Sequence, residues 1–135
     1  MYTVSREFTF CYGHRLLDHS GKCAHPHGHN GTVSISLCNE ILNENGMVLD
    51  FAELKRTVGR WIEDNLDHRM ILQSNDPLVD VLQQMNEPMY LMDEKPTAEN
   101  LARLIFEKSE QFGFPVRSVV FWETAKCSAE YRSSH

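Results

Sequence analysis

The sequence predicts an α+β fold in which helices pack on one face of an antiparallel sheet. Three observations predict it: two alternating runs open the chain, apolar residues at helical spacing fill its middle, and two further strand-like runs close it. No repeat, linker or low-complexity stretch divides the 135 residues. We therefore expect a single domain over residues 1–135, which is long enough to bury a sizeable core.

Residues 2–16 and 27–39 are the first two predicted strands. Alternate side chains of a strand point to the same face. This alternation groups the aromatic residues of the first strand with His14, and it groups His27 with His29 in the second. Both strands therefore present histidines at one end of a face that is otherwise apolar.

Three helices are predicted between the two pairs of strands. The first begins after the N-cap Asp50, ends near Asn65 and places Gly59 on its solvent side. The second is a short helix over residues 77–85, because proline is favoured at the first helical position.

The third helix begins after the N-cap Thr97 and ends at Gly113. Its inner side is predicted to consist of Leu101, Leu104, Ile105 and Phe112. A short apolar run at 89–92 precedes it, and strands at 116–124 and 128–133 follow it.

Charge and hydropathy exclude several classes of function. The net charge is −6 and the pI is near 5.6, whereas a nucleic-acid-binding domain usually carries a basic face. The sequence has neither an apolar signal-peptide core nor the roughly 18-residue apolar run of a membrane span. We therefore expect a cytoplasmic protein without nucleic-acid or membrane partners.

Histidines and one cysteine cluster near the N-terminus. Five of the seven histidines fall between positions 14 and 29, and Cys23 lies among them. In a cytoplasmic chain the four cysteines are expected to be free thiols, metal ligands or nucleophiles rather than disulfides. Cys11 and Cys38 fall in strand-like runs and are expected to be buried, inert thiols.

His27-Gly28-His29 has the spacing of a metal-binding pair, because residues i and i+2 of a strand face the same way. His14, at the end of the neighbouring strand, supplies a third imidazole on the matching face. Three histidines bind Zn²⁺ and leave its fourth position open, as in catalytic zinc sites. His19 and His25 lie in the loop and are weaker candidates.

Two interpretations of Cys23 remain open at this point. As a fourth ligand it would close a structural Cys-His₃ site. As a free thiol beside the metal it would serve as a base or nucleophile, since Lys22, the adjacent histidines and zinc would all lower its pKa.

Asp67-His68 and Glu123 are further candidates, each with an ordinary alternative. A carboxylate and an imidazole near a thiol make an acid–base relay, but the same dipeptide is also typical of a solvated helix end. Glu123 follows an apolar strand, where a carboxylate is either functional or simply exposed at the strand end.

The chain resembles the family of 6-pyruvoyl- and 6-carboxytetrahydropterin synthases. Six segments carry the resemblance in the same order along the chain: FCYGHRL (10–16), CAHPHGHN (23–30), MVLDFAELK (47–55), LDH (66–68), PTAENLA (96–102) and ET (123–124). Three residues separate Cys23 from His27, a spacing similar to that of the queuosine-pathway 6-carboxytetrahydropterin synthases. Residues 73–95 form a longer excursion than the shortest members carry, and Gly13 replaces the usual alanine.

The resemblance implies a role for each candidate residue. The zinc ligands are His14, His27 and His29. Cys23 becomes the general base, with Asp67 and His68 as its relay partners. Glu123 anchors the pterin ring and joins the relay, and Thr97 contacts the pterin.

The resemblance also implies a fold and a reaction. The fold is the tunnelling fold, in which ββααββ subunits close a barrel, commonly a homohexamer with sites between subunits. The substrate is 7,8-dihydroneopterin triphosphate, and a zinc-dependent lyase reaction yields 6-carboxy-5,6,7,8-tetrahydropterin, acetaldehyde and triphosphate. Lys22, Arg15, Lys55 and Arg69 are the available cations for the triphosphate. The alternatives are 6-pyruvoyl synthase activity, a structural zinc module without turnover, and a zinc hydrolase acting on a related pterin or purine.

Overall fold

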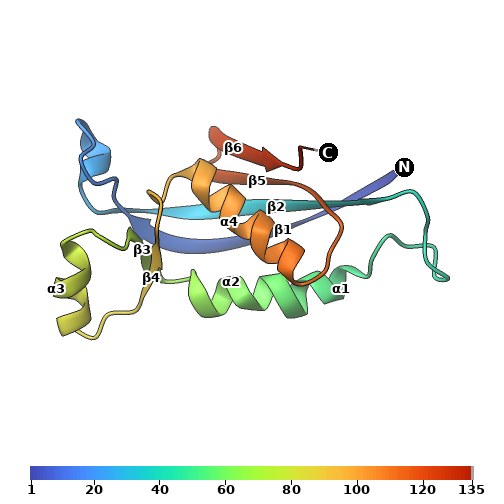
Figure 1. The fold of residues 1–135 in the computed structure, drawn as a ribbon, viewed down its shortest axis with the longest axis horizontal. Helices are drawn as coiled ribbons and strands as arrows, with labels where there is room; N and C mark the ends of the chain where they lie inside the picture. Colours follow the sequence, from blue (N-terminus) through green and yellow to red (C-terminus); the bar gives the residue numbers. More distant parts are fainter. Residues whose placement is uncertain (135) are drawn as a thin grey trace.

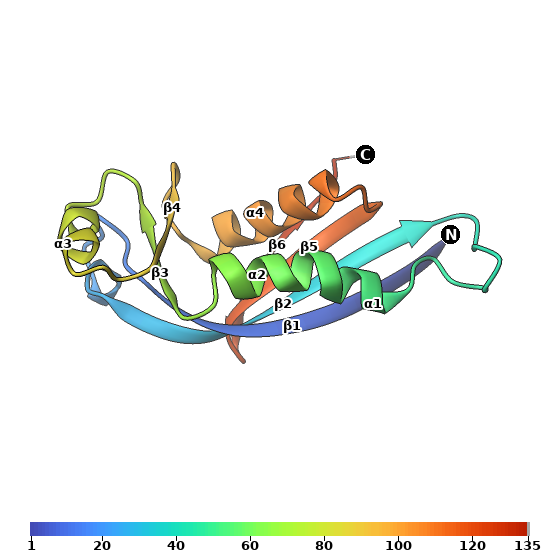
Figure 2. The same ribbon diagram turned by 90° about the horizontal axis from the view of Figure 1, so that it is seen from below.

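The computed structural model describes residues 1–134, and a six-stranded sheet forms its centre (Figure 1). The order of the strands across the sheet is β4-β3-β1-β2-β5-β6. Their bounds are β1 Tyr2–His14, β2 His27–Asn39, β3 Arg69–Gln73, β4 Met89–Met92, β5 Val116–Thr124 and β6 Cys127–Arg132. The sheet curls into a half-barrel, and the long strands β1 and β2 bend along its length (Figure 2).

The longer helical segments cover one face of this sheet, as the sequence predicts, and the short helix α3 lies at one end of the molecule (Figure 2). Their bounds are α1 Phe51–Leu54, α2 Arg60–Asn65, α3 Leu78–Gln84 and α4 Ala98–Gln111. A π-helical turn, Lys55–Gly59, joins α1 to α2, and a 3-10 turn, Lys22–Ala24, lies between β1 and β2. The core lies between α4, α1–α2 and the sheet, with Leu54, Leu101 and Phe121 among its fully buried side chains.

The sheet is mixed, which corrects the expectation of an antiparallel sheet. The pairs β1–β2, β2–β5 and β5–β6 are antiparallel, but β3 runs parallel to both β1 and β4. The sequence pattern missed β3, because this strand has five residues and only its middle is apolar. The segment with α3 carries the chain back between β3 and β4, and such a crossover gives a parallel pair. Helices α1–α2 run in the same direction as β1 (Figure 1), so β3, which follows them, enters the sheet parallel to β1.

The predicted helix 50–65 forms, but its glycine lies on the opposite side from the one expected. The Asp50 carboxylate caps the helix by accepting a hydrogen bond from the Ala52 N–H at 2.9 Å. Gly59 is buried, and a Cβ there would come within 2.8 Å of the Phe8 ring. The prediction that Gly59 faces solvent is therefore wrong, because Phe8 from β1 covers this position.

Helix α4 begins and ends where the sequence predicts. The Thr97 hydroxyl accepts from the Asn100 N–H at 3.2 Å, and Gly113 adopts a φ of +91° after the last turn. Phe112, expected on the inner side, is 42% exposed because it lies at the C-cap, beyond the packed turns. The first strand ends at His14 rather than residue 16, and the last strand is Cys127–Arg132.

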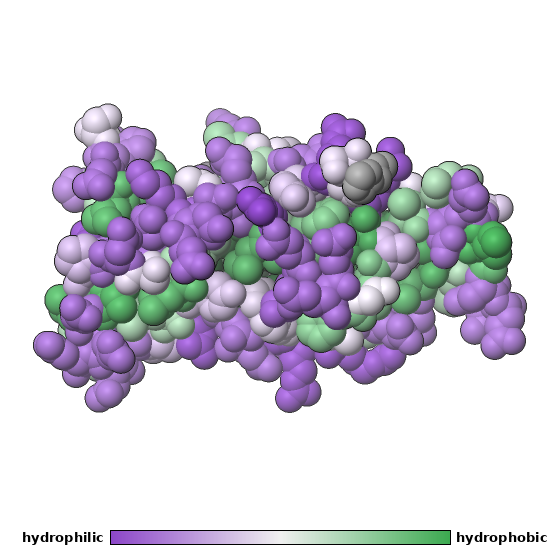
Figure 3. Space-filling view, viewed as in Figure 1, coloured by the Kyte–Doolittle hydropathy of each residue, from purple (hydrophilic) through white to green (hydrophobic). Residues whose placement is uncertain are grey.

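The molecular surface is mainly hydrophilic on the face shown in Figure 3. Apolar side chains appear at the two ends of this view, over α3 and near the loop after β2. Exposed Val81 and Met85 belong to the first region, and Ile41 and Met47 belong to the second. None of the helices within residues 1–134 has the length and apolar character needed to cross a membrane.

Candidate metal centre and active site

Pairing between β1 and β2 brings the three predicted histidines together. In this antiparallel register His14 lies opposite His27, and Tyr12 lies opposite His29. The ring centroids of the histidines are 4.5 Å apart for His14 and His27 and 5.1 Å apart for the other two pairs. One ring nitrogen from each histidine lies within 4.8 Å of the other two. His19 and His25 are not part of this cluster.

The hydrogen bonds of the histidines suit metal binding. His14 Nδ1 lies 2.7 Å from the Pro96 carbonyl oxygen, and His27 Nδ1 lies 2.8 Å from the His25 carbonyl oxygen. A ring that donates through Nδ1 keeps a free lone pair on Nε2, as metal-bound histidines usually do. The Nε2 atoms of His14 and His29 are buried and have no hydrogen-bond partner among the described residues.

The electrostatic surroundings of His14 also favour a neutral ligand. Burial lowers its pKa, and the neighbouring His27 and His29 lower it further, against an opposing effect of the Pro96 carbonyl and Glu123. A metal-ligating histidine must be unprotonated. Three convergent imidazoles fit a transition-metal ion, so these residues form a possible three-histidine metal site.

A cavity of about 250 Å³ opens beside this cluster, and Cys23, Thr97 and Glu123 line it together with His14 and His27. The Glu123 carboxylate lies 3.9 Å from His29 Nε2. Cys23 is half-buried in its 3-10 turn, where its carbonyl oxygen accepts from the Leu16 N–H at 2.7 Å. Among residues 1–134 the converging nitrogens come from these three histidines, so Cys23 lies near them without belonging to the ligand cluster.

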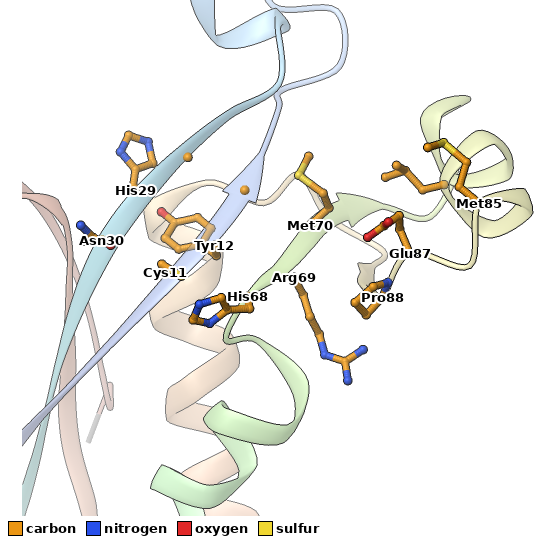
Figure 4. A pocket seen from close by; sticks show the side chains of 13 residues that line it. Cys11, Tyr12, His29, Asn30, His68, Arg69, Met70, Met85, Glu87 and Pro88 are labelled. Atoms are coloured by element: carbon orange, nitrogen blue, oxygen red, sulfur yellow. The ribbon is translucent and has the colours of Figure 1, made fainter.

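Asp67 and His68 lie elsewhere in the chain, beside Cys11, and Figure 4 shows His68 next to Cys11. The Asp67 carboxylate is 3.0 Å from His68 Nδ1 and accepts from the Cys11 N–H at 3.1 Å. The backbone N–H of His68 donates to the backbone carbonyl of Cys11 at 2.7 Å, and His68 adopts a φ of +59°. These residues do not line the cavity of Cys23, so one chain alone does not assemble the predicted relay.

The Asp67–His68 pair borders a larger cavity of about 670 Å³. Figure 4 shows Cys11 and His68 on its β1 side, and Met85, Glu87 and Pro88 opposite them. These last residues belong to the excursion 73–95, so this segment forms one wall of the cavity.

Two of the four predicted cations, Arg15 and Arg69, have clearly different surroundings in the structure. Arg15 forms a two-point ion pair with the buried Asp76, with a distance of 2.8 Å between its Nε and the carboxylate. This pair raises the pKa of Arg15 and lowers that of Asp76, chiefly through the hydrogen bonds. Arg69, by contrast, lines the larger cavity. Lys22 and Lys55 are exposed.

Sequence reasoning missed two residues near these sites. Cys11, expected to be an inert thiol, is half-buried beside an imidazole and a carboxylate. Alternation along β1 could have placed it on the face opposite His14, but its neighbours depend on the pairing with β3. Tyr12 was recognised only as part of an apolar face, yet its buried hydroxyl has no hydrogen-bond partner among residues 1–134.

Comparisons with known proteins relate the whole chain to one family. The family model described as 6-pyruvoyl tetrahydropterin synthase matches residues 3–134. Proteins named 6-carboxy-5,6,7,8-tetrahydropterin synthase are similar to the chain: that of Rickettsia typhi is 33% identical and covers 96% of this chain and 99% of its own. The protein of the same name from Haemophilus influenzae is 32% identical, and the similarity covers 98% of this chain and 99% of that protein.

Solved structures extend the similarity to the fold. A 6-pyruvoyl tetrahydropterin synthase from Caenorhabditis elegans has a TM-score of 0.74 and 28% identity, covering 98% of this chain and 96% of its own. An uncharacterized protein from Wolinella succinogenes has a TM-score of 0.83 and 28% identity, covering 98% of both chains. The fold, the three-histidine cluster and the match over nearly the whole chain together show that this protein belongs to the 6-pyruvoyl tetrahydropterin synthase family of enzymes.

Proposed function

We propose that this chain is a zinc-dependent lyase of queuosine biosynthesis. It converts 7,8-dihydroneopterin triphosphate and one molecule of water to 6-carboxy-5,6,7,8-tetrahydropterin, acetaldehyde and triphosphate. The observation that carries the proposal is the cluster of His14, His27 and His29, beside a cavity lined by a thiol and a carboxylate. The names of the similar full-length proteins support this choice of product. We expect the reaction in the cytoplasm, within one domain of residues 1–135.

Zinc is the metal that best suits the donor set. Three neutral imidazoles with an open fourth position are typical of catalytic zinc, which would supply Lewis acidity toward the hydroxyl groups of the substrate side chain. The separation of Cys23 from the converging nitrogens favours an open site over the closed structural one.

The other residues of this cavity have roles that follow from their chemistry. The Cys23 thiolate takes and returns protons at the carbons of the substrate side chain. The Glu123 carboxylate accepts two parallel hydrogen bonds from the amino and N–H edge of the pterin, as carboxylates do from arginine. Thr97 borders the cavity where the pterin is expected, and its hydroxyl caps α4.

The relay of Asp67 and His68 requires a second copy of the chain. Because these residues lie apart from the cavity of Cys23 within one chain, we propose that they act on Cys23 of a neighbouring subunit. The edge strands β4 and β6 and the exposed apolar regions at the two ends supply surfaces for assembly. We propose a closed homo-oligomer, most simply a hexamer of two trimeric rings.

Product analysis tests the proposed reaction. We expect the purified zinc protein, incubated with dihydroneopterin triphosphate, to give the 6-carboxy product and acetaldehyde by mass spectrometry. A 6-pyruvoyl product would show the alternative activity of the same scaffold, and hydrolysis without loss of side-chain carbons would show a hydrolase.

Two variants complete this test. His29→Ala should lose both zinc and product, because two remaining ligands rarely hold zinc tightly. Cys38→Ala, which changes a strand thiol away from both cavities, should keep both. Full zinc content in His29→Ala would contradict the ligand assignment, and a zinc-loaded protein without turnover would favour the structural module.

A further inference from the structure

The hydroxyl of Tyr12 is one of three buried side-chain polar atoms without a hydrogen-bond partner among the described residues. The other two are the Nε2 atoms of His14 and His29, which the metal site uses. Tyr12 is only 4% exposed, and its ring contacts both histidines, with centroids 5.2 Å and 5.7 Å away. A buried hydroxyl without a partner is unfavourable, so its presence beside a metal site requires an explanation.

The ring of Tyr12 reaches from β1 across β2 toward β5. It can do so because position 31 on β2 is a glycine: a Cβ there would lie 3.1 Å from Tyr12 Cε1 and 2.9 Å from Phe121 Cζ. The rings of Tyr12 and Phe121, 5.7 Å apart, therefore meet above Gly31. In Figure 4 the hydroxyl end of Tyr12 is directed toward β2, away from Cys11. Glu123 follows Phe121 on β5 at the next position of the same parity.

The position of Glu123 creates a conflict that the tyrosine can resolve. Its carboxylate oxygen is 3.9 Å from His29 Nε2, so it lies close to the position that a metal bound to this nitrogen would take. Glutamate is a common zinc ligand, and a fourth protein ligand closes a catalytic site. The same carboxylate is also needed for the pterin ring in the proposed function. A neutral donor on its other side would restrain it.

We propose that Tyr12 is a positioning residue whose hydroxyl donates a hydrogen bond to Glu123 in the metal-loaded protein. This bond keeps the carboxylate off the metal and directs it toward the substrate. The inference rests on the proposed function for the pterin, but the restraint of Glu123 depends only on the metal site.

Cobalt(II) provides a direct readout, because its visible spectrum reports the ligands and coordination number. The test compares wild type, Tyr12→Phe, Glu123→Gln and the double variant, each loaded with cobalt(II). Tyr90→Phe is the matched control, since Tyr90 lies on β4 against Trp61. We expect Tyr12→Phe to bind one cobalt ion with a changed spectrum, Glu123→Gln to abolish this change, and Tyr90→Phe to match wild type. A spectrum of Tyr12→Phe identical to wild type would overturn the proposal.

Binding of neopterin to the zinc-loaded proteins gives a second readout. We expect Tyr12→Phe to weaken neopterin binding about tenfold, the usual effect of losing a hydrogen bond to a charged group. In the Glu123→Gln background the same change should have less than about a twofold effect, because Tyr12 acts through Glu123. An equal loss in both backgrounds would overturn the proposal. If wild type and Tyr90→Phe fail to bind neopterin while the cobalt spectra behave as expected, the pterin substrate is wrong and the role of Tyr12 stands.

Discussion

Two cysteines of this chain lie beside different acid–base groups. Cys23 faces the cavity next to the three histidines, whereas Cys11 contacts Asp67 and His68 on the other side of β1. Of these two thiols, Cys23 is the one close to the proposed metal, and Cys11 is the one close to the Asp67–His68 pair of the same chain. The two thiols are therefore expected to differ in what their loss does.

Replacement of Cys23 tests its proposed role as a base. Cys23→Ala should keep its zinc and its fold, because neither a ligand nor a large core side chain is removed. Its turnover should fall by about 10²–10⁴-fold, the usual contribution of a positioned acid or base. Zinc content by atomic absorption and steady-state kinetics measure the two effects, with Cys38→Ala as the control. Loss of zinc from Cys23→Ala would instead assign this thiol to the metal.

The residues of the metal site could be predicted because their geometry is local. Alternation along a strand fixes which side chains share a face, and one hairpin register brings His14 to His27. The surroundings of Cys11 could not be predicted in this way, because Asp67 is 56 residues away in the sequence. Its contact depends on the parallel pairing of β1 with β3, which has no local signal.

The surroundings of Gly59 could not be predicted from the sequence for the same reason, because they depend on a distant segment. Helical spacing places this residue in the helix but says nothing of what packs on it, and Phe8 from β1 covers it. The strand β3 was missed because it is short and only its middle is apolar, and its parallel pairing depends on segments distant in the sequence. Helix caps such as Asp50 and Thr97 were predicted correctly because capping is a local hydrogen bond.

Replacement of Gly59 by alanine should destabilise the protein, contrary to its usual effect. Alanine in an exposed helix position stabilises by about 1 kcal/mol over glycine. Here the new methyl would lie 2.8 Å from the Phe8 ring, so overpacking should instead cost about 1–2 kcal/mol. Urea unfolding measures the difference. In a Phe8→Leu background, where the ring is absent, Gly59→Ala should no longer destabilise.

The ion pair of Arg15 and Asp76 joins the end of β1 to the segment that leads into α3. Asp76 also accepts from the Leu78 N–H at 2.8 Å and is 3% exposed. We expect Asp76→Asn to lower the free energy of unfolding by about 2–3 kcal/mol at pH 7, because it leaves Arg15 without its charged partner.

The pH dependence of this loss has a defined sign. The hydrogen bond from Arg15 lowers the pKa of Asp76 below its ordinary value of 3.8. The folded carboxylate therefore keeps its charge to a lower pH than the unfolded one, and its stabilisation is lost as the pH falls through the folded value. The difference in melting temperature between wild type and Asp76→Asn should stay constant above about pH 5 and shrink below about pH 4. A difference that grows in acid would contradict the assignment.

The whole molecule is a half-barrel that a single chain does not close. Its sheet ends at β4 on one side and β6 on the other, so two edges are available for other copies. Cys23 is separate from Asp67 and His68 within one chain. This separation is explained if neighbouring subunits close the barrel and bring Asp67 and His68 of one subunit to Cys23 of the next. The sequence suggests this assembly through the family resemblance and through the sheet edges that its paired strands leave uncovered, but contacts between subunits leave no periodic pattern.

Mixed oligomers test whether the site is shared. Cys23→Ala and His68→Ala should each have low activity alone, whereas oligomers refolded from an equal mixture should recover activity. If the subunits mix at random, about one quarter of the sites pair an intact Cys23 with an intact His68 from a neighbour. Activity near a quarter of wild type is therefore expected, measured as product per zinc. A mixture of Cys23→Ala with the Cys23→Ala/His68→Ala double variant is the control and should stay inactive, because it contains no intact Cys23. If the first mixture also stays inactive while both variants form oligomers of native size, the relay does not operate between subunits, and Asp67-His68 is a solvated helix end beside Cys11.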